Sequence, residues 1–113
     1  MRRVLLAEDE PVVRRLLSNL LELMSFEVKT TSSVAAAKAL VGTESFDLIV
    51  ADYSLEDGNV ESLYFWLGVE HPELVNKFIL ITGWPYLEGF PIILQKPFHL
   101  RELEEVVKQV LGD

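Results

Sequence analysis

Polar side chains stand at the ends of the apolar runs in this sequence. Glu8 and Asp9 follow the first run, Asp52 follows the third, Thr82 closes the fourth, and Lys96 comes after the fifth. Three carboxylates that lie close together repel one another and raise one another's pKa, so a cluster of this kind needs a cation. Hard oxygen ligands without His or Cys favour Mg²⁺. A divalent ion and the lysine would together balance the three negative charges.

Each of these residues also has an ordinary structural interpretation. Asp9 or Glu10 could cap a helix that begins at Pro11. Thr82 could be a simple β-former, and Lys96 a solvated strand end. For any one of these residues the structural interpretation is a reasonable alternative to a functional one. A single chemical site, however, explains all the positions at once.

Short apolar runs alternate with segments of helical periodicity along the chain. The runs predict strands over Arg3–Ala7, Phe26–Thr31 at an edge, Phe46–Ala51, Lys77–Thr82 and Ile92–Leu94. The periodic segments predict helices beginning at Pro11, over Val34–Val41 with Ser32 or Ser33 as cap and Gly42 as stop, over Val60–Glu70, and over Leu100–Leu111. Nearly continuous apolar strands separated by helices imply a parallel sheet covered on both faces.

The predicted fold is therefore α/β, a doubly wound five-stranded parallel sheet in a three-layer sandwich, because right-handed crossovers leave few other topologies. In such folds ligands bind at the carboxyl ends of the strands. Those ends are where the polar residues stand, so we expect the side chains to converge on one pocket.

The connection before the last strand is too short for a helix. Only the eight residues of Gly83–Phe90 remain for it once the strand is counted. Returning along a strand of roughly 17 Å takes about eleven residues as an α-helix, whereas eight extended residues span about 26 Å. We therefore predict an extended segment or a single turn, with the fourth helix absent or vestigial.

Composition limits the class of protein. The chain has 113 residues, of which 50% are hydrophobic, which suffices for one core and predicts one domain over residues 1–113. There is no cysteine for disulfides or thiolate metal sites, and no apolar run is long enough for a membrane span or a signal-peptide core. A net charge of −8 argues against direct nucleic-acid binding. We expect a cytoplasmic protein without membrane contact.

The motifs "AED", "VAD", "ITG" and "QKPF", in this order and spacing, resemble the receiver domain of bacterial two-component response regulators. The resemblance covers essentially the whole chain and implies the flavodoxin-like strand order 2-1-3-4-5. It implies that Asp52 accepts a phosphoryl group from a phosphohistidine on a sensor histidine kinase or histidine phosphotransfer protein. Thr82 would then hydrogen-bond the phosphoryl oxygens, and Lys96 would pair with them. Such a domain catalyses its own phosphorylation and dephosphorylation and signals by conformational change, without being an enzyme for other substrates.

The same resemblance implies a Mg²⁺ site. Asp9, with Glu8 acting through water, would hold the ion together with Asp52 and the backbone carbonyl of Ser54. It also implies a cis peptide bond before Pro97, and proline is the residue type that permits one.

Departures from the family pattern fall on the surface that many regulators use for output. They are the short connection and Ile93, which stands where the family often has tyrosine or phenylalanine. A degenerate receiver that acts only as a protein-interaction module is therefore the main alternative. A dehalogenase-type phosphatase is disfavoured because Ser54 stands where its "DxD" pattern needs a second aspartate. A flavin-binding module is disfavoured because "AEDEP" would repel a phosphate.

Overall fold

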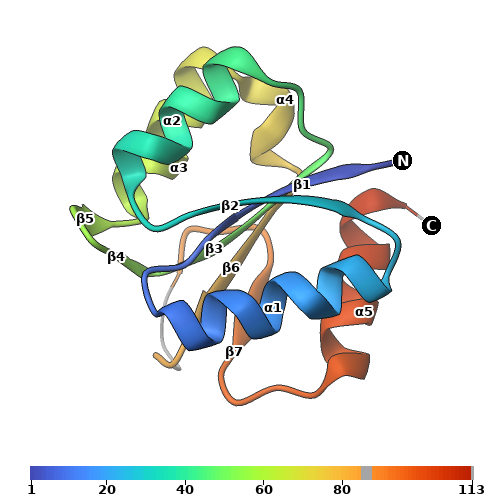
Figure 1. The fold of residues 1–113 in the computed structure, drawn as a ribbon. Helices are drawn as coiled ribbons and strands as arrows, with labels where there is room; N and C mark the ends of the chain where they lie inside the picture. The colour runs from blue at the N-terminus through green and yellow to red at the C-terminus, as the bar shows by residue number, and fades with distance from the viewer. Residues whose placement is uncertain (85–87, 113) are drawn as a thin grey trace.

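The computed structural model describes residues 1–84 and 88–112. Its central sheet has five strands: β1 (Arg3–Ala7), β2 (Glu27–Thr31), β3 (Leu48–Asp52), β6 (Phe78–Thr82) and β7 (Ile93–Gln95). Their order is β2-β1-β3-β6-β7, and all four neighbouring pairs are parallel (Figure 1). The predicted doubly wound sheet of order 2-1-3-4-5 is confirmed.

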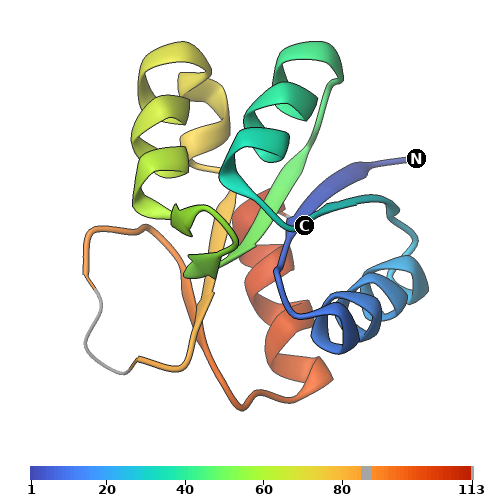
Figure 2. The ribbon, with the colours of Figure 1, turned by 60° about the vertical axis from the view of Figure 1, so that its left-hand side comes forward.

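Helices cover both faces of this sheet. The helices are α1 (Pro11–Leu23), α2 (Val34–Thr43), α3 (Glu61–Glu70), the single-turn α4 (Pro72–Val75) and α5 (Leu100–Leu111). Helices α1 and α5 lie on one face and α2 and α3 on the other (Figures 1 and 2). The three-layer sandwich is therefore confirmed.

Alternation along each strand divides the core between the two faces. In β1, Val4 and Leu6 pack toward α1 and α5, whereas Leu5 and Ala7 pack toward α2 and α3. The central strands read as unbroken apolar runs because both of their faces are buried. Strand β2 is the more polar edge strand that the sequence predicts, and Thr31 is its one buried residue.

Most element boundaries shift by one or two residues from the predictions. The last strand begins at Ile93 and runs to Gln95, and Gly42 lies inside α2 one residue before its end. Ser33, not Ser32, caps α2: its hydroxyl accepts a hydrogen bond from the N–H of Ala36 at 3.1 Å. Two elements have no counterpart in the sequence analysis, the hairpin of β4 (Ser54–Leu55) and β5 (Gly58–Asn59), and helix α4. The hairpin and α4 are each too short to leave a periodic pattern of apolar residues in the sequence.

The crossover between β6 and β7 contains no helix among its described residues, 83–84 and 88–92. The described residues at both ends of this crossover are visible in orange at the left of Figure 2. Helix α4 precedes β6, so it is not the fourth helix of the usual receiver order. The prediction of an extended segment or single turn falls in part on residues 85–87, which lie outside the described residues.

A side chain from the hairpin completes the N-terminus of α2. The carboxylate of Asp57 accepts hydrogen bonds from the N–H groups of Val34 at 2.7 Å and Ala35 at 3.0 Å. These donors are among the four that an α-helix cannot satisfy internally. They lower the pKa of Asp57 below its ordinary value, Val34 contributing most. The hairpin that follows β3 is thereby attached to α2.

Asp57→Asn should lower stability near neutral pH and have little effect in acid. Because the pKa of Asp57 is lower in the folded state, its contribution is present above the unfolded value of 3.8 and is lost as pH falls through the folded value. Thermal unfolding midpoints of the two proteins should therefore differ at pH 7 and converge in acid, once the pH is below the folded-state pKa of Asp57. Equal differences at both pH values would show that the charge of Asp57 is not what stabilises α2.

Candidate functional site

The sequence-predicted residues meet at the carboxyl edge of the sheet. Asp52 is the last residue of β3 and Thr82 the last of β6. Glu8 and Asp9 follow β1 directly, and Lys96 follows β7. The parallel register sets these ends side by side, because Asp52 is paired with Ile81, one residue before Thr82.

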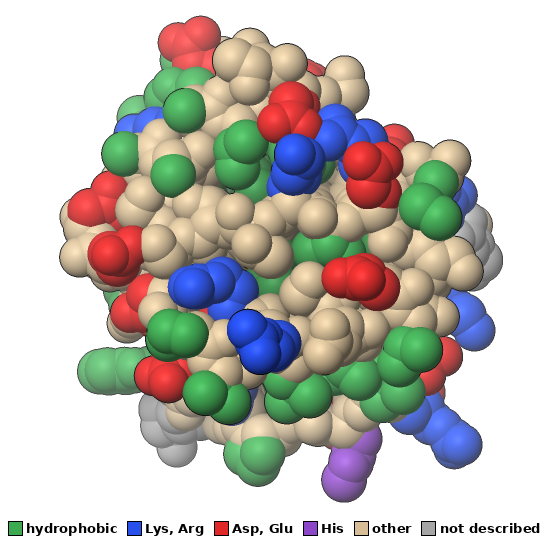
Figure 3. Space-filling model, viewed as in Figure 1, with side chains coloured by type: hydrophobic (Ala, Val, Ile, Leu, Met, Phe, Trp, Pro, Cys, Tyr) green, Lys and Arg blue, Asp and Glu red, His purple; other side chains and the backbone are tan. Residues whose placement is uncertain are grey.

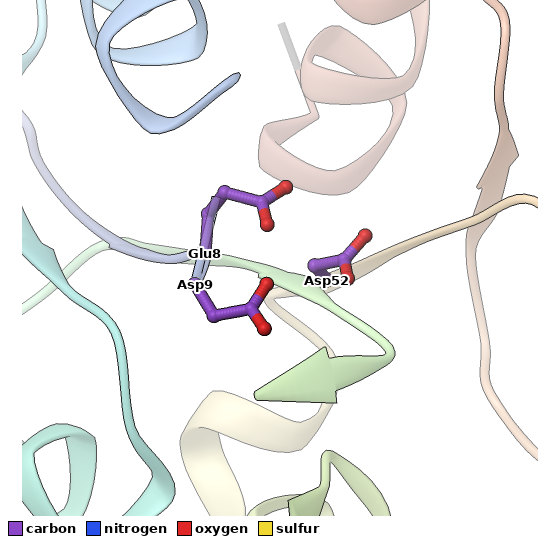
Figure 4. Close-up of side chains that lie close together, drawn as sticks. All are labelled: Glu8, Asp9 and Asp52. Carbon is purple, nitrogen blue, oxygen red and sulfur yellow. The ribbon is translucent and has the colours of Figure 1, made fainter. Parts of the chain in front are cut away.

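Three carboxylates form the centre of this site. Glu8, Asp9 and Asp52 each offer an oxygen, and these oxygens all lie within 4.8 Å of one another. Figure 4 shows the side chains of Glu8 and Asp9 reaching from the end of β1 toward that of Asp52. Glu8 is buried, the side chain of Asp52 is 12% exposed, and Asp9 is exposed. Such an all-oxygen cluster, open on one side, fits a hard divalent cation that keeps some of its water ligands.

Lys96 supplies the positive charge of the site. Its Nζ lies 2.7 Å from Oδ1 of Asp52 and 3.4 Å from Oε1 of Glu8. Burial lowers the pKa of Lys96, but the hydrogen bonds and charges of Asp52 and Glu8 outweigh it and leave the pKa raised. The ammonium group is therefore charged at neutral pH. Its backbone N–H donates to the carbonyl of Thr82 at 2.7 Å, and the bond to Pro97 is cis, as the resemblance implies.

Glu8 is the most constrained of the acidic groups. Burial raises the pKa of its carboxyl group, and the charge of Asp52 raises it further. The N–H of Glu10, which donates to Oε2 of Glu8 at 3.2 Å, and the charge of Lys96 oppose this rise. Glu10 itself occupies the N-cap position of α1, but its side chain makes no capping hydrogen bond. The capping interpretation is therefore wrong for Glu10.

Thr82 and Ser54 border the open side of the site. Thr82 is buried, and its hydroxyl accepts a hydrogen bond from the N–H of Trp84 at 3.0 Å. The N–H of Ser54 donates to Oδ2 of Asp52 at 3.2 Å. Together with Asp52 and Lys96 they line a cavity of about 440 Å³, whose wall is completed by Tyr53, Gly83 and Trp84. The structure thus brings every predicted site residue together.

Sequence reasoning missed one contact of the site. Nη1 of Arg14 donates to the main-chain carbonyl of Glu8 at 2.8 Å. The helical position of Arg14, one turn after the strand end that carries Glu8, is the only signal that could have indicated this contact.

Comparisons with known proteins agree with this geometry. The family model of the response regulator receiver domain matches residues 4–84. The chain is 30% identical over 118 residues to the response regulator protein PilR of Pseudomonas aeruginosa, covering 97% of this chain and 26% of PilR. It is 30% identical over 119 residues to the response regulator receiver protein CpdR of Brucella abortus, covering 98% of both chains. The chain therefore spans about a quarter of PilR and nearly all of CpdR.

A solved structure shows the same fold. The response regulator TrrA of Thermotoga maritima, determined in complex with Mg²⁺ and BeF, superimposes with a TM-score of 0.90 at 24% identity, covering 98% of this chain and 100% of that one. A parallel sheet with an acidic pocket and a lysine at its carboxyl edge is the architecture of a receiver-type signalling domain. The chain belongs to the response regulator receiver family. Among its described residues, no helix has both the length and the apolar character needed to cross a bilayer.

Proposed function

We propose that residues 1–113 form a receiver domain that takes a phosphoryl group from a phosphohistidine onto Asp52. The observation that carries this proposal is the pairing of Lys96 with Asp52 at 2.7 Å beside a three-carboxylate cluster. The donor would be a sensor histidine kinase or a histidine phosphotransfer protein in the cytoplasm. The proposal includes self-catalysed phosphorylation and dephosphorylation, and no direct binding of nucleic acid or membrane.

The chemistry needs no general base. A carboxylate oxygen of Asp52 forms the new P–O bond as the P–N bond of the phosphohistidine breaks, and the imidazole keeps that bonding pair and takes up a proton. The obstacle is repulsion between the anionic donor and the carboxylate. Catalysis of the transfer therefore depends mainly on positioning of the reactants and on compensating positive charge. Lys96 would oppose the charge of the transferred group, and the hydroxyl of Thr82 would donate a hydrogen bond to its oxygens.

The acidic cluster fits Mg²⁺. Asp9 and Asp52 would bind the ion with the backbone carbonyl of Ser54, and buried Glu8 would act through water. Mg²⁺ neutralises charge on the phosphoryl oxygens when bound. The structure of TrrA with Mg²⁺ and BeF supports this assignment by analogy of fold.

Helix α1 offers a docking surface for the phosphodonor protein. Val12 and Leu16 are 75% and 57% exposed, and α1 begins two residues after Asp9. Figure 3 shows apolar side chains exposed over α1. Exposed apolar groups beside a reactive pocket are typical of interaction sites.

Incubation with Mg²⁺ and acetyl phosphate tests the proposed function. Intact-mass spectrometry should show the mass of one added phosphoryl group, lost again with time. A receiver that serves only as an interaction module would gain no mass under the same conditions, and this result would decide for the alternative.

Mg²⁺ should bind weakly and reversibly and change the fluorescence of Trp84. Trp84 lines the cavity with Asp52 and is 68% exposed, so its surroundings change when the site is filled. Asp9→Ala should raise the apparent dissociation constant at least about tenfold, which corresponds to about 1.4 kcal/mol of binding free energy. Titration curves that coincide for the two proteins would remove Asp9 from the site.

Phosphorylation should change the crossover more than α5. Ile93 is β-branched and partly buried, so a large side-chain swing there is disfavoured. The hydroxyl of Thr82 is instead linked to the N–H of Trp84, which couples the site to the crossover. With beryllofluoride and Mg²⁺, amide hydrogen exchange should slow chiefly at residues 83–84 and 88–90. Slowing confined to α5 would contradict this route.

A further inference from the structure

Among the described residues of the crossover from β6 to β7, no helix covers the sheet beside α3. The parallel crossover from β6 to β7 would place a helix beside α3 if it were right-handed and helical. No described residue of the crossover is helical, and Phe90 occupies part of that space. Its ring lies 4.8 Å from that of Tyr64 and 6.1 Å from that of Phe78, centroid to centroid. One aromatic side chain thus covers part of what a helix would cover.

An apolar groove remains between α3 and the end of the crossover. It has a volume of about 680 Å³ and is lined chiefly by Tyr64, Phe65, Gly68, Val69, Val75 and Phe90. Phe65 and Val69 lie one turn apart on α3 and are 76% and 65% exposed. Large apolar side chains at this exposure, next to a hollow of this size, are the usual features of an interaction surface.

Gly68 indicates that the groove is not a by-product of packing. A glycine inside a helix costs about 0.5–1 kcal/mol relative to alanine. A Cβ at position 68 would meet only Cγ2 of Val75, at 3.9 Å, which is an ordinary contact. The fold would therefore accept a methyl group here and gain helix stability. Because glycine has no side chain, the groove stays deep at position 68.

The charge of the groove indicates which kind of partner it binds. Glu61 and Glu88 line the groove, and none of its described lining residues is Lys or Arg. A second copy of this chain, with its net charge of −8, would be repelled, as would an anionic lipid surface. The vacant space lies where a crossover helix of this fold would lie. We propose that the groove binds an amphipathic α-helix of a partner protein, with apolar residues on one face flanked by Lys or Arg. This proposal does not depend on phosphoryl transfer.

The test uses the full chain, labelled with ¹⁵N, and a synthetic helical peptide of about 18 residues, five turns. The peptide carries Leu and Phe at i, i+4, i+7 and i+11 and Lys beside them. Amide shifts should change in α3 and at residues 88–90. A peptide with Glu in place of Lys should bind at least tenfold more weakly.

Matched variants identify the surface. Gly68→Leu fills the groove and should weaken peptide binding at least tenfold while the unfolding midpoint is kept or raised. Phe65→Ser removes an exposed apolar side chain of the groove and should also weaken peptide binding. It tests the same surface if the Gly68→Leu protein misfolds. Leu23→Ser changes a similarly exposed apolar side chain, 78% exposed at the end of α1, and should leave binding unchanged. No binding to the wild type, shifts confined to α1, or unaltered binding by Phe65→Ser would overturn the proposal. Sedimentation showing a dimer that Phe65→Ser dissociates would assign the groove to a second copy instead.

Discussion

Asp52→Asn should abolish the phosphoryl mass gain while leaving the fold intact. The substitution replaces an anionic carboxylate with a neutral amide whose oxygen is a poor nucleophile. The fold should persist because Oδ1 of asparagine can accept the same hydrogen bond from Lys96 that Oδ1 of Asp52 accepts at 2.7 Å. One charge of the repelling cluster of Glu8, Asp9 and Asp52 is also removed. Intact-mass spectrometry with acetyl phosphate and Mg²⁺ measures the loss directly.

Asp47→Asn is the matched control for this experiment. Asp47 precedes the same strand, β3, at its opposite end, and accepts a hydrogen bond from the N–H of Arg3 at 2.8 Å. The identical chemical change there should leave the mass gain as in the wild type. Labelling of the Asp52→Asn protein at the wild-type level would show that another residue is the acceptor.

Lys96→Met should reduce both phosphorylation and stability. The methionine keeps an apolar stem but removes the charge that lies 2.7 Å from Asp52 and 3.4 Å from Glu8. Loss of one electrostatic stabiliser typically lowers a rate about 10²–10³-fold. Glu8 is buried and would lose its cation, but the Lys96 side chain is 33% exposed. The destabilisation should therefore fall below the about 3–5 kcal/mol typical of a fully buried pair.

Adding Mg²⁺ distinguishes the effect of Lys96→Met on stability from its effect on phosphorylation. Because the ion would replace part of the missing positive charge, it should raise the unfolding midpoint of Lys96→Met more than that of the wild type. Lys108→Met makes the same change on the exposed side of α5 and should alter neither phosphorylation nor the response to Mg²⁺. Wild-type phosphorylation rates in Lys96→Met would exclude a role for this lysine in the reaction.

The layered fold and the place of the site could be predicted from the sequence because both depend on local patterns. Unbroken apolar runs such as Phe78–Thr82 indicate strands buried on both faces, and parallel strands necessarily bring their carboxyl ends to one edge. Chain length alone predicts that the crossover forms no full helix, since eight residues are too few for the return path, and its described residues are not helical. The roles of Asp9, Thr82 and Lys96 in phosphoryl transfer remain predictions.

Other features were decided only by tertiary packing. Glu8 and Asp9 are neighbours in sequence, yet Glu8 is buried, with its Oε1 3.4 Å from Nζ of Lys96, whereas Asp9 is exposed. Asp57 caps a helix that begins 23 residues earlier, and Arg14 reaches the carbonyl of Glu8. No periodicity encodes such contacts, since they depend on which polar groups each packed element leaves unsatisfied. The groove over Gly68 has the same origin: the described residues of the crossover form no helix, and only the folded chain shows which apolar side chains beside it stay exposed.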